Sequence, residues 1–232
     1  MAISARKQVI LQTIIKEYLK TAQPVSSGFL VAKSKLGISP ATVRNEMMEL
    51  EEAGYIYQPH TSAGRIPTAL AYELYVQEFI DQKKIAKIAD QQGQVLDKIF
   101  ELEEASFKQV AKMIAELSQA AVFWAFHKNN LYYTGISNLF SQAEFKQVDL
   151  IYDVSSVIDQ MEEIIDRIFN KLPMGEQVLI GRQNPFGDFL STVIVKYNLG
   201  NQSGVFGILG PLRMDYENNL ALANYIKKKL IK

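Results

Sequence analysis

Two short groups of polar residues are the candidates for chemistry in this sequence. The first lies on the exposed side of a predicted helix start and consists of Ser39, Ala41, Thr42, Arg44 and Asn45. Arginine and asparagine can bond to base edges or phosphates in a DNA groove, and small neighbours let a helix approach that groove. The alternative is that these side chains are simply solvated, as most polar groups on helix surfaces are. Taken alone, the group is weak evidence for nucleic-acid binding.

The second group lies in the segment 59–67, which has the sequence P-H-T-S-A-G-R-I-P. Its candidate residues are His60, Thr61, Ser62, Gly64 and Arg65. Hydroxyls, an imidazole, a guanidinium and a flexible backbone together suit contacts with phosphate. A plain surface turn is the alternative, and the segment taken alone favours that alternative.

The helix that carries the first group is predicted to run from residue 38 to residue 52. Ser39 can cap its N-terminus, and Pro40 suits the first helical position. Val43, Met47 and Leu50 follow helical spacing, so they are expected to form a buried face. The first group of candidates therefore falls on the opposite, exposed face.

The elements predicted on either side of this helix favour DNA binding. Helical patterns predict a helix over residues 4–20 and a second from residue 26 or 27 to about 35, joined to the candidate helix by the tight turn L-G-I-S. Two short helices joined in this way form a helix-turn-helix, whose second helix enters the major groove. The β-prone run 54–58 follows, so the segment 59–67 would form a wing.

Charge is distributed unevenly along the chain, although its formal net value is zero. Residues 1–45 contain seven basic side chains and one acid, a net charge of +6, whereas residues 46–56 contain four acids and no base. A basic front of this kind can contact phosphate. A surface of mixed charge is the alternative.

Composition excludes several other classes of protein. The chain has 232 residues, no cysteine and two histidines, so neither a disulfide framework nor a convincing metal cluster is expected. No apolar run is long enough for a membrane helix and no signal peptide is recognisable, so the cytoplasm is the expected location. We find no catalytic constellation and expect no enzyme activity, no cofactor and no metal.

The second half is predicted to be α+β. Helices are expected from residue 68 to about 91 and from 95 to 120, with a pause at 91–94, and the later helix is a candidate for dimerisation. A hairpin is expected around Asn129 and Asn130, then helices over 144–172 with Ser155 or Ser156 as an internal cap. Three strands are expected at 177–181, 189–197 and 204–209, and a last helix at 215–231.

The run S-P-A-T-V-R-N-E-M-M-E-L-E-E-A-G-Y-I-Y-Q-P-H-T-S-A-G-R-I-P-T, residues 39–68, resembles the winged-helix domain of the HrcA family of heat-inducible transcription repressors. The resemblance extends from about Arg6 to Val76. Later segments, such as G-V-F-G-I-L-G-P-L-R-M-D-Y, resemble the family's C-terminal blocks. One departure is Ser26-Ser27-Gly28, where the family usually has Gly-Ser-Arg or Gly-Ser-Lys.

The resemblance implies a fold and a division into domains. The expected fold is α+β, with an N-terminal winged helix-turn-helix at 1–76, a helical linker and dimerisation region at 77–120, and a reduced GAF-like antiparallel α+β domain at 121–232. Family members are usually about a hundred residues longer. The shortfall is expected between Ala121 and Leu131, which would leave a smaller or differently completed sheet.

The resemblance also implies a function. It predicts a repressor of heat-shock genes that binds an inverted-repeat operator in double-stranded DNA as a homodimer, with a chaperonin as modulator and no membrane partner. The two groups of candidate residues would be its DNA contacts. The alternative is a transcription regulator that senses a small molecule through its GAF-like domain.

Overall fold

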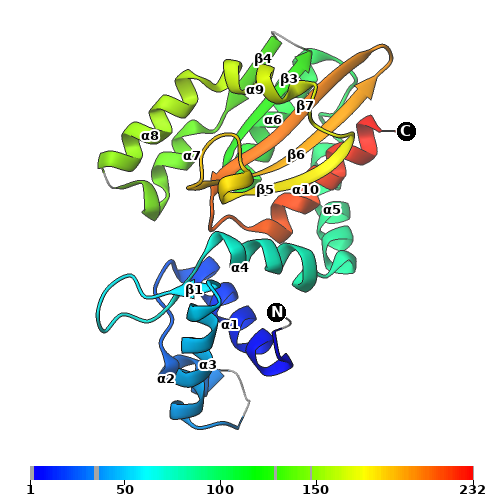
Figure 1. Ribbon diagram of the computed structural model, residues 1–232. Coiled ribbons are helices and arrows are strands. Elements are labelled where there is room, and N and C mark those ends of the chain that lie inside the picture. The colour runs from blue at the N-terminus through cyan, green and yellow to red at the C-terminus, as the bar shows by residue number, and fades with distance from the viewer. Residues whose placement is uncertain (1–2, 34–36, 128–129, 147, 232) are drawn as a thin grey trace. The chain divides into compact units, whose positions relative to one another are not determined.

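The structure is a computed structural model that describes residues 3–33, 37–127, 130–146 and 148–231. The chain forms two compact units, Met1–Ile80 and Asp81–Lys232, which we call the winged unit and the sheet unit (Figure 1). This division differs from the expected three parts. The helices expected to form a separate linker pack inside the sheet unit, because their apolar faces are buried against its last helix and its sheet.

The winged unit begins with three helices whose boundaries follow from their caps. These are α1 (Ala5–Thr21), α2 (Ser27–Lys33) and α3 (Pro40–Glu52). The Ser4 side chain accepts a hydrogen bond from the Lys7 amide at the start of α1, and Ser39 caps α3 in the same way. Leu30 of α2 packs with the buried apolar residues of α1 and α3, so the predicted helices of the helix-turn-helix are confirmed, although Leu36 of its turn lies outside the described residues.

A small antiparallel sheet completes the winged unit. Strand β1 (Ile56–Tyr57) pairs with β2 (Ile66–Pro67), and the segment between them is the predicted wing. Val25, between α1 and α2, adds a bridge through two 2.9 Å hydrogen bonds with the Arg65 backbone. After the sheet come α4 (Ala69–Leu74) and one π-helical turn, η1 (Tyr75–Phe79).

The helix boundaries between residues 68 and 120 are where our predictions were wrong. The chain becomes extended at Ile80, and Asp81 caps α5 (Gln82–Leu96), so the predicted pause at 91–94 lies inside a helix. The break comes later, before α6 (Glu104–Ser118). Gly93 has a packing role rather than a helix-breaking one. A Cβ atom there would lie 3.1 Å from the ring of Tyr225, so the glycine lets the last helix approach closely.

Within the described residues, the sheet unit contains a five-stranded antiparallel sheet in the order β4-β3-β7-β6-β5. Its strands are β3 (Ala121–His127), β4 (Asn130–Thr134), β5 (Gly175–Ile180), β6 (Leu190–Leu199) and β7 (Gln202–Pro211). The predicted hairpin is therefore confirmed as β3 and β4, although Asn129 of its turn lies outside the described residues. This hairpin completes the sheet by pairing with β7.

Helices cover both faces of this sheet (Figure 1). One face carries α7 (Ile136–Ser141), α8 (Val148–Asp159) and α9 (Met161–Phe169), whose apolar residues join Phe123 and Ile194 in one core. The other face carries α6 and α10 (Tyr216–Leu230). The expected α+β class is confirmed, and the arrangement is consistent with a GAF-like domain. Ser155 and Ser156 lie inside α8 rather than at a cap, because the break falls at Gln160.

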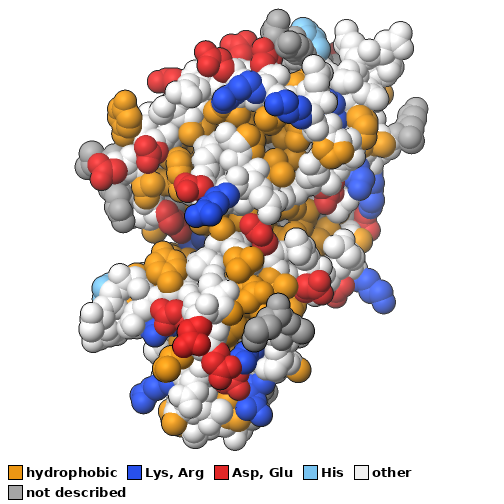
Figure 2. All heavy atoms as spheres, viewed as in Figure 1, with side chains coloured by type: hydrophobic (Ala, Val, Ile, Leu, Met, Phe, Trp, Pro, Cys, Tyr) orange, Lys and Arg blue, Asp and Glu red, His pale blue; other side chains and the backbone are white. Residues whose placement is uncertain are grey.

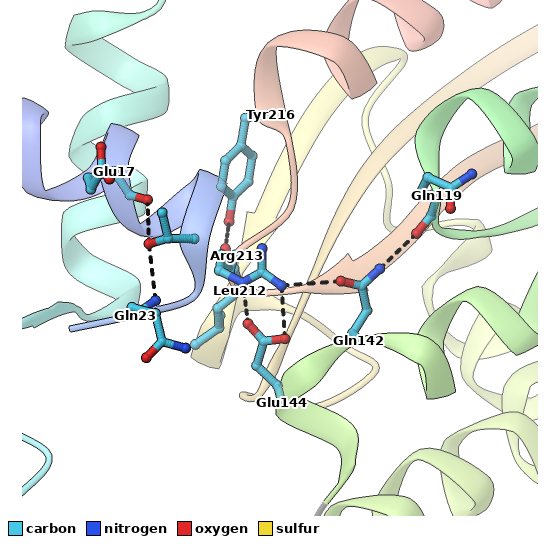
Figure 3. A network of polar contacts seen from close by, with 9 residues as sticks. Glu17, Gln23, Gln119, Gln142, Glu144, Leu212, Arg213 and Tyr216 are labelled. Carbon is cyan, nitrogen blue, oxygen red and sulfur yellow. Dashed lines mark hydrogen bonds and ion pairs between the residues drawn. The ribbon is translucent and has the colours of Figure 1, made fainter. Parts of the chain in front are cut away.

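A polar network ties the start of α10 to the connections on the opposite side of the sheet unit. Figure 3 shows Arg213 directed at Glu144 and Gln142, with the Arg213 Nε to Glu144 Oε1 distance at 2.5 Å and Arg213 Nη2 to Gln142 Oε1 at 3.3 Å. The Gln142 amide donates in turn to the Gln119 carbonyl at 3.1 Å. The network fixes the loop after β7 to the segment that follows α7.

Candidate nucleic-acid interface

The start of α3 presents the first group of candidates to solvent. The Ser39 hydroxyl accepts a hydrogen bond from the Thr42 amide at 3.1 Å, and this cap orients the first turn. Val43 lies on the buried face, together with Met47 and Leu50. Because that stripe fixes the rotation of the helix, the positions left exposed are Ala41, Arg44 and Asn45, while Thr42 is half-buried.

Arg44 lies beside a surface hollow of about 310 Å³ between the helix-turn-helix and the wing. Its Nε atom donates to the Ser27 hydroxyl at 3.4 Å, so the guanidinium is tethered to the start of α2. The hollow is lined by Ser26, Ser27, Arg44, Met47, Met48, Ser62, Ala63, Gly64 and Arg65. Two guanidiniums and three hydroxyls therefore converge in one place from three segments of the chain, and such a set can hold an anion.

The wing is held against α3 by one carboxylate. Glu51, near the end of α3, accepts a hydrogen bond from the Gln58 amide at 3.0 Å through Oε1 and pairs with Arg65 Nε at 2.8 Å through Oε2. Gln58 and Arg65 lie on opposite sides of the wing. The carboxylate thus fixes both sides of the wing, just after β1 and just before β2, to the candidate helix.

Arg65 and Gly64 therefore have roles in the base of the wing. The Arg65 side chain is only 17% exposed, because it packs beside Glu51. A Cβ atom at Gly64 would lie 2.4 Å from the Val25 carbonyl carbon, so only glycine fits where the wing crosses that segment. The same Arg65 side chain, which ends in Nη1 and Nη2, also lines the hollow.

The tip of the wing carries the three other candidates in exposed positions. His60 Nδ1 lies 3.2 Å from the Thr61 carbonyl oxygen, and the Ala63 amide closes a turn onto the His60 carbonyl at 3.0 Å. Ser62 has a φ of +69°, in the left-handed region. The turn places His60, Thr61 and Ser62 on the outside of the wing.

Ion pairs reduce the charge asymmetry seen in the sequence. Arg6 on α1 pairs with Glu46 on α3 at 3.2 Å, and Lys7 pairs with Glu49, whose carboxylate raises the pKa of Lys7. Figure 2 shows acidic and basic side chains side by side on the winged unit. Part of the basic front therefore binds the acids of α3 instead of remaining free for phosphate. Lys16, Lys20 and Lys33 stay exposed.

Sequence reasoning missed several residues of this surface. Ser26 and Ser27 were named only at the start of the second helix and as a departure from the family pattern, and neither Met48 nor Glu51 was a candidate. Met48 follows Arg44 by one helical turn and is 52% exposed, so its spacing was an available signal. The pairing of Glu51 with the wing had no such signal, because it depends on how the strands fold back onto α3.

Other kinds of site receive no support from the described part of the chain. Within residues 3–33, 37–127, 130–146 and 148–231, no three acidic or histidine side chains form a group that could hold a metal ion. In the same residues, no helix is both long and apolar enough to cross a membrane.

Two family models match this chain. The model described as "Winged helix-turn-helix transcription repressor, HrcA DNA-binding" matches residues 2–81, and "HrcA protein C terminal domain" matches residues 42–219. The chain belongs to the HrcA family. These models describe a DNA-binding repressor family rather than an enzyme family, and the DNA-binding model, over residues 2–81, contains both groups of candidate residues.

Similar proteins extend over the full chain. The heat-inducible transcription repressor HrcA of Carboxydothermus hydrogenoformans is 29% identical over 332 aligned positions, covering 98% of this chain and 97% of that protein. Because this chain has 232 residues, at least 100 of those positions have no residue here (332 − 232). The HrcA of Desulforudis audaxviator is 52% identical over 87 residues, covering 38% of this chain and 25% of that protein.

A solved structure supports the fold. The crystal structure of a hypothetical protein at 2.2 Å resolution aligns with a TM-score of 0.78, covering 98% of this chain and 97% of that chain. Its sequence identity is 19%, so the likeness concerns the fold alone.

Proposed function

We propose that this protein is a transcription repressor that binds double-stranded operator DNA through α3 and the wing and thereby controls heat-shock genes. The observation that carries the proposal is the capped, half-buried helix α3 held beside the wing by Glu51. This arrangement presents Arg44, Asn45 and the wing tip as one surface. The names of the HrcA relatives supply repression and heat induction.

The residues of this surface divide into two classes of contact. We propose that Asn45 and the outer part of Arg44 contact base edges in the major groove. Their exposure on the first turns of α3 supports this assignment. Ala41 and Thr42 have small side chains, so they would let the helix approach the floor of the groove closely. Phosphate contacts fall to Ser39, to the wing residues His60, Thr61, Ser62, Gly64 and Arg65, and to the hydroxyls of Ser26 and Ser27 around the hollow.

The proposed operator is an inverted repeat, and the proposed form of the protein is a homodimer. A two-fold repeat in DNA is matched by two-fold symmetry in the protein, with one winged unit on each half-site. We further propose a cytoplasmic location and a chaperonin as the partner that modulates activity. These points rest on the family resemblance.

A mobility-shift experiment tests the proposal. The purified chain should shift DNA that carries the inverted repeat at much lower protein concentration than scrambled DNA of the same length. Its affinity should fall steeply with salt, because phosphate contacts release counterions. Equal affinity for both DNAs at every salt concentration would contradict sequence-specific repression.

A further inference from the structure

The broad apolar faces of α5 and α6 are occupied within one chain. The apolar face of α5, with Ile85, Ala89 and Leu96, is buried on α10, and that of α6 packs on β3. Phe107 of α6 stacks on Trp124 with ring centroids 4.7 Å apart. These faces are therefore not free to join two copies, and only single apolar side chains such as Val95 and Leu102 stay exposed on α5 and in the segment after it.

The five-stranded sheet has two edges, and they differ in their protection. Strand β5 follows Pro173 and carries Glu176, which is half-buried and lies opposite Val195 of β6. Burial raises the pKa of Glu176, and its Oε2 atom has no hydrogen-bond partner in the described residues. A proline and an inward-pointing charge are the features that keep an edge strand from pairing with another chain.

Strand β4 has neither of these features. Its five residues, N-L-Y-Y-T, include no charge and no proline, and its central residues are apolar or aromatic. Tyr133 is 44% exposed, on the face that Leu131 shares with the core. Among the described elements, the substantial contacts of β4 are with β3 and α6, so its outer edge is the end of the sheet.

We propose that two copies of this chain pair along β4, in antiparallel register about Tyr132, to form one continuous sheet. The occupant of the edge is a second copy, because an uncharged strand meets its own image without like charges and offers matching main-chain donors and acceptors. In this register Tyr133 lies opposite Leu131 of the second copy and diagonal to that copy's Tyr133, so the two rings would cover the junction. The inference rests on the proposed function, which requires a two-fold dimer.

The length of the chain agrees with this location. Our sequence analysis placed the segment that longer relatives possess between Ala121 and Leu131, which is the β3–β4 hairpin. A dimer formed through β4 would extend the sheet at the place where we expect the longer relatives to have their additional segment. Five residues a side make a modest interface, so the dimer should dissociate when a single charge is added.

The first test uses a charge on each edge of the sheet. Tyr133→Lys should convert the dimer to a monomer in light scattering at micromolar concentration, whereas Met174→Lys, at the exposed residue before β5, should leave the dimer intact. Circular dichroism checks that both variants are folded. A folded, dimeric Tyr133→Lys would overturn the proposal.

The second test uses the absence of cysteine from the chain. Tyr132→Cys introduces a single thiol that would face its own copy across the junction, so mild oxidation should give a disulfide-linked dimer. The control Gln177→Cys, in the middle of β5, should give none. Equal cross-linking of the two variants, or none for Tyr132→Cys, would contradict pairing along β4.

Binding to DNA separates this inference from the proposed function. If β4 joins the dimer, Tyr133→Lys should bind the full inverted repeat at least tenfold more weakly than the unchanged protein. Its affinity for a single half-site should equal that of the unchanged protein. A dimer that survives Tyr133→Lys and still binds the operator would overturn only the β4 interface. An unchanged protein that binds neither DNA would overturn the proposed function itself.

Discussion

Glu51 connects the end of α3 to both sides of the wing, because each of its carboxylate oxygens accepts a different hydrogen bond. One bond comes from the Gln58 amide and the other from Arg65 Nε. Hydrogen bonds to a charged group are stronger than neutral ones, and this pair is partly shielded from water. A residue in the acidic part of α3 therefore positions the surface that we propose for DNA.

Arg65 can act by holding the wing or by contacting phosphate, and two variants separate these roles. Glu51→Gln removes the charge that holds Arg65 but leaves the guanidinium. We expect Glu51→Gln to weaken operator binding without lowering the salt slope, and Arg65→Ala to weaken binding to all DNA sequences and lower the slope by about one. Fluorescence anisotropy over a salt series measures both. If both variants weaken binding with unchanged slopes, Arg65 only positions the wing.

Asn45 and Arg44 are the residues from which we expect base discrimination. Asn45→Ala and Arg44→Ala should each reduce discrimination between the operator and its single-base variants by roughly 1–3 kcal/mol per lost base contact. Competition mobility shifts measure this difference. Asn201→Ala, in the exposed turn between β6 and β7, is the control and should have no effect. If neither α3 variant changes affinity or base preference, the assignment is wrong.

At the scale of elements, the wing depends on a close crossing of two segments. Val25 and Arg65 exchange backbone hydrogen bonds of 2.9 Å, and Gly64 lies directly against Val25. The crossing joins the segment before α2 to the second strand of the wing. It therefore sets the position of the wing relative to the helix-turn-helix.

Gly64→Ala should displace the wing. The new methyl group would lie 2.4 Å from the Val25 backbone, which cannot move without breaking the bridge. We expect a loss of about 1–3 kcal/mol in stability, a lower unfolding temperature and weaker operator binding. Gly28→Ala is the matched control, since the nearest atom to its Cβ is 3.9 Å away and alanine favours a helix. Equal behaviour of the two variants in thermal unfolding would contradict a tight crossing.

At the scale of the whole molecule, stability is a small difference between large terms. The sheet unit carries buried polar atoms that have no hydrogen-bond partner in the described residues, among them Asn184 Nδ2 and Glu176 Oε2. An unsatisfied buried group of this kind costs about 1–3 kcal/mol. Such costs in the unit that we propose to hold the dimer make its folded fraction sensitive to temperature.

We therefore expect operator binding to respond to heat and to chaperonin. Mild heating of the purified protein should reduce operator binding without full recovery on cooling, and chaperonin with nucleotide should restore it. Chaperonin without nucleotide is the control and should restore little. Full activity well above growth temperature, with no effect of chaperonin, would contradict this mechanism and favour regulation by a small ligand.

The sequence alone was sufficient for features that depend on near neighbours in the chain. Ser39 and Pro40 mark the start of α3, and Val43, Met47 and Leu50 mark its buried face. The strands of the sheet were predicted in the same way, and so was the exposed position of Ala41, Arg44 and Asn45 on α3. Caps, turns and helical or strand periodicity act over a few residues, so the pattern itself contains the physical cause.

The tertiary structure decided what depends on residues far apart in the sequence. Glu51 bonds Arg65 fourteen positions later, Arg6 pairs with Glu46 forty positions later, and Gly93 is a glycine because Tyr225 packs against it. Each of these pairings gives a residue a role that its local sequence does not indicate. Glu51 supports the wing, Arg6 is paired with an acid, and Gly93 allows close packing inside a helix. Local preference cannot determine such roles, because they arise only when packing has brought the partners together.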